Sequence, residues 1–154
     1  MKNNKGITLI ALVVTIIVLL ILAGVSIAML TGQNGILNRG QEAAYKNALT
    51  DAKDQISLKV AECITNYNAV VYAGATITGI TTTTDLDTYI STELATLKTN
   101  LEKNNVTVSL PTINEGAPES NAKITITATK NTGVSTSCTW ENGGVLSAWT
   151  DVGM

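Results

Sequence analysis

The sequence predicts an α+β fold in which a long N-terminal α-helix precedes a small antiparallel β-sheet. Three observations along the 154-residue chain indicate it: an apolar run over residues 7–30, helical periodicity over residues 36–72, and alternation of apolar and polar residues beyond residue 104. Roughly 120 residues follow the apolar run, which is enough for one domain with a modest core.

The apolar run carries no charged side chain between Ile7 and Leu30. As a helix rising about 1.5 Å per residue it would extend roughly 36 Å, more than the roughly 30 Å of a bilayer's hydrocarbon core. A cleavable secretory signal has an apolar stretch of only about 7 to 15 residues, so the weak cleavage-site match Ser26-Ile27-Ala28 is not our preferred interpretation. A plain membrane anchor fits the length but does not explain the Lys5-Gly6 pair that directly precedes the run.

The segment Lys5-Gly6-Ile7-Thr8-Leu9-Ile10 resembles the processing site of type IV prepilins, and the resemblance extends to about Ala44. The stretch LLILAGVS at residues 19–26 is typical of prepilin-like sequences from Gram-positive bacteria. The resemblance implies that a prepilin peptidase cuts after Gly6 and that Ile7, the new first residue, is N-methylated.

A pilin-like chain would be a single-pass membrane protein before assembly, with its N-terminus in the cytoplasm, and part of an extracellular pilus, or fimbrium, afterwards. Residues 1–6 would be the leader, 7–30 the transmembrane and filament-core helix, 31–35 a glycine break and 36–154 the extracellular head. The resemblance implies a helical homo-oligomer as the product, and an assembly ATPase and a membrane platform protein as partners. Adhesion, motility and DNA uptake are the roles it allows.

Two alternatives remain. A pseudopilin of a type II secretion or DNA-uptake machine has the same leader and span. An uncleaved bitopic membrane protein with an outer binding domain would keep residues 1–6.

Position 11 departs from the family, which usually carries Glu where this chain has Ala11. The family's acid is thought to pair with the amino terminus of a neighbouring subunit, and an unpaired charge in an apolar core is costly. We expect the Ile7 amine to be satisfied by the Thr8 hydroxyl or by backbone carbonyls. The Thr15 hydroxyl either contributes to this or bonds to a carbonyl of its own helix.

After the glycine break, an amphipathic helix is expected from Ile36 to about Tyr72. The residues expected on its buried face are Leu37, Tyr45, Ala48, Ala52, Ile56, Val60, Cys63, Ile64, Tyr67 and Val71. The loop over residues 73–84 contains a possible short strand at residues 75–80. Asp85 or Asp87 can cap a second helix. The apolar side of this helix is expected to consist of Leu86, Ile90, Leu94, Leu97 and Leu101.

The remainder predicts a meander of strands at residues 106–110 and 123–130, through Cys138 and Trp140, and at 145–150. Asn131-Thr132-Gly133 and Asn142-Gly143-Gly144 supply the last two turns.

Composition excludes several function classes. The formal net charge is −2 and the sequence pI is near 5.0, whereas nucleic-acid binding depends on clustered Lys and Arg. The chain has no His, which removes the usual general base and the commonest metal ligand. We therefore expect no enzyme activity, no cofactor and no direct contact with nucleic acid. Four carboxylates could bind calcium but are expected to serve as caps and turn residues: Asp85, Asp87, Glu141 and Asp151.

The two cysteines, Cys63 and Cys138, are expected to form a disulfide between the amphipathic helix and the sheet, worth roughly 4 kcal/mol in the chain-entropy estimate. The alternative is two reduced thiols packed as small apolar groups. Asn105-Val106-Thr107 matches an N-glycosylation sequon, but we do not expect it to be modified. Tyr45, Tyr67 and Tyr72 are expected to pack in the core or at interfaces.

Overall fold

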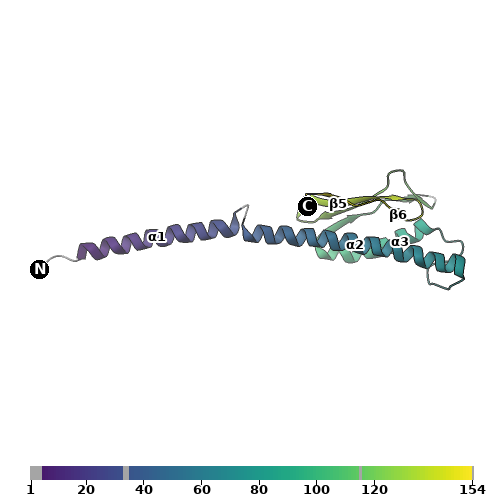
Figure 1. Ribbon diagram of the computed structural model, residues 1–154, viewed down its shortest axis with the longest axis horizontal. Helices are drawn as coiled ribbons and strands as arrows, with labels where there is room; N and C mark the ends of the chain where they lie inside the picture. The colour runs from purple at the N-terminus through teal and green to yellow at the C-terminus, as the bar shows by residue number, and fades with distance from the viewer. Residues whose placement is uncertain (1–4, 33–34, 115, 154) are drawn as a thin grey trace. The chain divides into compact units, whose positions relative to one another are not determined.

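The computed structural model describes residues 5–32, 35–114 and 116–153, with side chains from Leu9 onward (Figure 1). The fold is α+β, with a long N-terminal helical region followed by a small antiparallel sheet, as the sequence predicts. It divides into two compact units, residues 1–43 and residues 44–154.

The first unit contains helix α1, Lys5–Thr31, and the beginning of helix α2, Ile36–Ala73. The interruption between them coincides with the glycines at 32 and 35. A Cβ atom added to Gly32 would lie 2.7 Å from the Ala28 carbonyl oxygen, and one added to Gly35 would collide with the Leu30 carbonyl oxygen. The described backbone is thus helical to Thr31 and again from Ile36, and neither glycine has room for a side chain on this backbone path.

Two helices of the second unit pack on one face of the sheet (Figure 1). Helix α2 buries a stripe along one side: Leu49, Ala52, Ile56, Val60, Cys63 and Val70. Helix α3, Leu86–Leu101, has Asp85 as its N-cap and ends in a short 3-10 turn, Glu102–Asn104. Its apolar side is the predicted one, with Ile90, Leu94 and Leu101 buried. The α2 stripe differs at both ends, since Leu37 is exposed and Val70, rather than Val71, is buried.

The sheet is antiparallel and has the order β1-β4-β5, with β6 and β7 both paired to the free edge of β5. Its strands are β1 (Val106–Ser109), β4 (Lys123–Ala128), β5 (Asn131–Glu141), β6 (Val145–Leu146) and β7 (Thr150–Val152). Side chains of β1, β4 and β5 alternate between the core and an outer face rich in Thr and Ser. The core-facing members are Val106, Val108, Ile124, Ile126, Ala128, Val134, Thr136, Cys138 and Trp140.

Several local predictions were wrong. Residues 75–80 form no strand but a turn, in which the Ile80 amide donates to the Ile77 carbonyl and Gly79 has a φ of +89°. The β4–β5 turn lies at residues 129–130, and residues 131–133 form an irregular start of β5.

The expected last strand is divided into β6 and β7. The division coincides with Ser147, whose hydroxyl accepts a hydrogen bond from the Thr139 amide at 2.8 Å. A small separate hairpin, β2 (Ile113–Asn114) with β3 (Ala117–Pro118), was not predicted.

Candidate functional site: the processing junction, the apolar helix and the head

The predicted processing junction lies at the start of α1. The backbone of Gly6 and Ile7 is helical, in the first turn of Lys5–Thr31. Residues 1–4 and the side chains of residues 5–8 lie outside what the structure describes, so cleavage after Gly6, methylation of Ile7 and the role of the Thr8 hydroxyl remain predictions.

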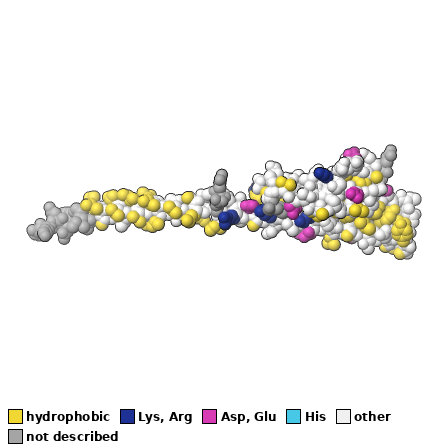
Figure 2. All heavy atoms as spheres, turned by 45° about the horizontal axis from the view of Figure 1, so that its top comes forward, with side chains coloured by type: hydrophobic (Ala, Val, Ile, Leu, Met, Phe, Trp, Pro, Cys, Tyr) yellow, Lys and Arg dark blue, Asp and Glu magenta, His cyan; other side chains and the backbone are white. Residues whose placement is uncertain are grey.

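Helix α1 is apolar on every side over residues 9–31. Every side chain from Leu9 to Thr31 is exposed, and the large apolar ones range from 45% exposed at Val13 to 70% at Met29. Figure 2 shows hydrophobic side chains along the length of this helix. A helix that is apolar all round is stable only where other apolar groups surround it, in a bilayer or in a protein core. Among the described residues, the helical region beginning at Leu9 contains the single candidate membrane span.

The three polar side chains between Leu9 and Thr31 all bond within their own helix. The Thr15 hydroxyl donates to the Leu12 carbonyl at 2.7 Å. The hydroxyls of Ser26 and Thr31 donate to the carbonyls four residues earlier, at 2.8 and 2.9 Å. This part of α1 therefore presents no hydroxyl proton that requires an external acceptor. For Thr15, the alternative of a bond within its own helix is the one found.

The glycine break has its own polar contacts. The Gly35 amide donates to the Gly32 carbonyl at 2.7 Å, and the side-chain amide of Asn38 donates to the same carbonyl at 2.9 Å. These two donors together replace the regular helical partner of the Gly32 carbonyl.

In the head, the carboxylate of Asp87 is buried, and the residue is only 1% exposed. Its Oδ1 accepts hydrogen bonds from the Trp140 indole and the Gly144 amide, both at 2.9 Å. Its Oδ2 accepts from the Gly143 amide at 2.7 Å. The side chain also lies in the first turn of α3, where the helix dipole favours a negative charge. Asp87 therefore joins α3 to β5 and to the β5–β6 turn.

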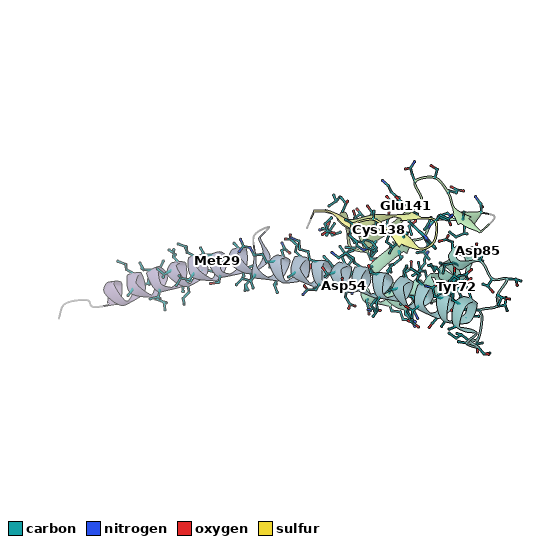
Figure 3. All side chains as sticks on the ribbon, turned by 45° about the vertical axis from the view of Figure 1, so that its right-hand side comes forward. Met29, Asp54, Tyr72, Asp85, Cys138 and Glu141 are labelled. Carbon is teal, nitrogen blue, oxygen red and sulfur yellow. The ribbon has the colours of Figure 1, made fainter. Side chains whose placement is uncertain are left out.

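The other carboxylates considered as calcium ligands have separate surroundings. Asp85 caps α3 by accepting from the Thr88 amide at 3.0 Å, and its position is labelled in Figure 3. Asp151 accepts from the Thr136 hydroxyl at 2.6 Å and lies 3.8 Å from the Lys53 ammonium. Glu141 is exposed at the end of β5. Within residues 5–32, 35–114 and 116–153, no three potential metal-ligating side chains of Asp, Glu, His or Cys come together.

The expected disulfide is not formed: Cys63 and Cys138 are both free and buried. The two thiols have different surroundings in the core. Cys63 lies near Glu93 and Tyr89 of α3, and burial, reinforced by the Glu93 charge, raises its pKa to about 11. Cys138 is on the sheet (Figure 3), where burial alone raises its pKa to about 12. The alternative of two reduced thiols in the core is the one found.

The sequon asparagine and the three tyrosines lie at different depths in the fold. Asn105 is exposed and has a φ of +62°, at the residue that leads into β1. Tyr45 and Tyr67 pack partly buried against the core, whereas Tyr72 is 81% exposed near the end of α2 (Figure 3).

Comparison of the chain with models of protein families, with curated proteins and with solved structures finds no match.

Proposed function

We propose that this protein is the structural subunit of a type IV pilus-like filament. The observation that carries the proposal is the helix α1, which is apolar on every side over residues 9–31 and follows directly on the prepilin-like junction Lys5-Gly6-Ile7. A globular head with a core of its own follows it along the chain.

The need to bury apolar surface gives a physical reason for joining an apolar helix to a folded head. An isolated helix with such a surface is insoluble in water, but it is compatible with a bilayer before assembly and with a bundle of identical helices afterwards. The internally bonded hydroxyls of α1 suit both surroundings, since an unsatisfied donor would be costly in either.

Maturation would begin with cleavage after Gly6 by a prepilin peptidase and N-methylation of Ile7. An assembly ATPase and a platform protein would then move the subunit from the membrane into the extracellular filament. The head would be held outside the cell, where the buried contacts of Asp87 join α3 to β5.

The experiment is to compare two glycine variants in the native cell, Gly6→Leu and Gly24→Leu. Gly24 is the matched control because it lies in the same helix and an added Cβ there meets nothing within 4 Å. We expect Gly24→Leu to be processed, whereas Gly6→Leu accumulates in the membrane as the uncut precursor. Intact-mass analysis of sheared surface filaments should find wild-type chains that begin at methylated Ile7.

Other outcomes distinguish the alternatives. Assembled material whose chains begin at Met1 or Gln33 would contradict the proposal. An intact leader in membrane-extracted wild-type protein, with no filaments, would favour an uncleaved bitopic protein. Correct processing with only short or scarce filaments would favour a pseudopilin.

A further inference from the structure

The β5–β6 turn contains a chemically labile dipeptide, Asn142-Gly143. An asparagine followed by glycine is prone to deamidation, because glycine has no side chain to hinder attack by its backbone nitrogen. The Gly143 nitrogen bonds to the Asn142 side-chain carbonyl carbon, the bond from that carbon to the amide nitrogen breaks, and ammonia leaves with the proton lost by Gly143. Water then opens the resulting succinimide to aspartate or isoaspartate.

This turn is exposed and so accessible to the water that the reaction needs, since both Asn142 and Gly143 are exposed. Gly143 also has a φ of +80°, a conformation that glycine adopts without strain. Exposure and sequence alone would therefore mark residues 142–143 as a deamidation site.

The nucleophile, however, is held by a buried charge. The Gly143 N–H donates to Asp87 Oδ2 at 2.7 Å, and Asp87 is 1% exposed. A charge-assisted hydrogen bond stabilises the neutral N–H form of the Gly143 amide and fixes the direction of the N–H bond. The negative carboxylate also disfavours loss of the amide proton, because that loss would place a second negative charge beside it.

We propose that Asp87 protects Asn142-Gly143 from deamidation and that residue 142 becomes a modification site when this contact is lost. The contact between Asp87 and Gly143 thus has a chemical role as well as a structural one. The inference concerns the head alone and does not depend on filament assembly.

The geometry provides a selective variant, Asp87→Asn. The Oδ1 atom takes two of the three donors, so an asparagine side chain can keep its oxygen on Trp140 and Gly144. Its NH2 group then replaces Oδ2 and, being a donor, cannot accept from Gly143. Asp85→Asn is the matched control, since Asp85 lies two residues earlier, contacts the Thr88 amide instead, and asparagine caps helices as well as aspartate does.

The test is to incubate the full-length chain in detergent micelles at mildly alkaline pH and to follow residue 142 by peptide mass mapping with isoaspartate detection. We expect the folded wild type and Asp85→Asn to deamidate at least about tenfold more slowly than the urea-unfolded wild type, the factor implied by one lost charge-assisted hydrogen bond. Asp87→Asn, shown to be folded by circular dichroism, should deamidate at least about tenfold faster than Asp85→Asn.

The proposal is overturned if folded and unfolded wild type deamidate at equal rates, or if folded Asp87→Asn and Asp85→Asn do. Should Asp87→Asn fail to fold, equal deamidation rates of folded and unfolded wild type would still overturn the proposal. Hydrogen exchange of the Gly143 amide supplies the second measurement, and rapid exchange in the folded wild type would equally contradict the proposal.

Discussion

Replacement of Asp87 by alanine should destabilise the head far more than any other single change to a carboxylate described above. The substitution leaves the Trp140 indole and the Gly144 amide without an acceptor in a buried site. Each orphaned donor costs about 1–3 kcal/mol, so for the two buried donors together we expect a loss of about 4 kcal/mol.

The matched control is Asp85→Ala, which removes an exposed helix cap and should cost about 1 kcal/mol. For a head of this size, 1 kcal/mol corresponds to a change in Tm of about 4 °C, so the expected decreases are about 15 °C for Asp87→Ala and about 4 °C for Asp85→Ala. Thermal unfolding can be followed by near-ultraviolet circular dichroism, which reports on the packing of the aromatic side chains, Trp140 among them. Equal decreases in Tm for the two variants would refute the reasoning, because the buried contacts would then contribute no more than an exposed cap.

The remaining predictions concern other parts of the chain. At pH 8 both thiols should resist alkylation in the folded protein and react once the protein is unfolded. The reason is that burial raises the pKa of Cys63 to about 11 and that of Cys138 to about 12. Labelling of only one thiol, or of none, after unfolding without reductant would contradict this prediction. The raised pKa values also mean that the folded state holds the two thiol protons more tightly than the unfolded state does. The free energy of unfolding should therefore decrease as the pH rises above about 9, the pKa of a thiol in the unfolded chain. Serine at both positions should reduce this decrease, as measured by urea titration. Gly40→Ala should raise helicity and add up to about 1 kcal/mol, since nothing lies within 4 Å of the added Cβ. Gly35→Ala should instead disturb the backbone by collision with the Leu30 carbonyl oxygen, which amide exchange at Gly32 would detect. Ala11→Glu should leave filament yield unchanged or raise it, whereas Thr8→Val should lower it; the opposite pattern would show that the Ile7 amine is satisfied in another way.

Periodicity was sufficient to predict helices α2 and α3 and strands β1, β4 and β5. Spacings of three and four placed Ala52, Ile56 and Val60 on one buried face of α2, and the alternation over residues 124–128 gave the inward side chains of β4. These patterns arise from burial of one face, which each element records in its own sequence. The expected glycine break also rests on local composition, and an added Cβ at Gly32 or Gly35 would lie too close to a backbone carbonyl oxygen.

Features that depend on distant partners were not predictable in this way. Asp87 has the position of a helix cap in the sequence, and only the folded chain brings it against Gly143, 56 residues away. Both cysteines were correctly expected in the core, but whether two core thiols meet depends on the packing of α2 against α3 and on the register of β5. The division between β6 and β7 depends on a side-chain bond from Ser147 to β5 that no periodicity records.

The internal bonding of the hydroxyls in α1 has a thermodynamic consequence for the proposed filament. Between Leu9 and Thr31 the helix offers neighbours only non-directional apolar contacts, whether those neighbours are lipid chains or other copies of itself. Transfer from bilayer to bundle would therefore exchange one apolar environment for another, with no polar group to desolvate and little change in hydrophobic free energy. Extraction and return would then be nearly balanced for this segment, so the direction of the process would be set by the assembly ATPase and by contacts between heads.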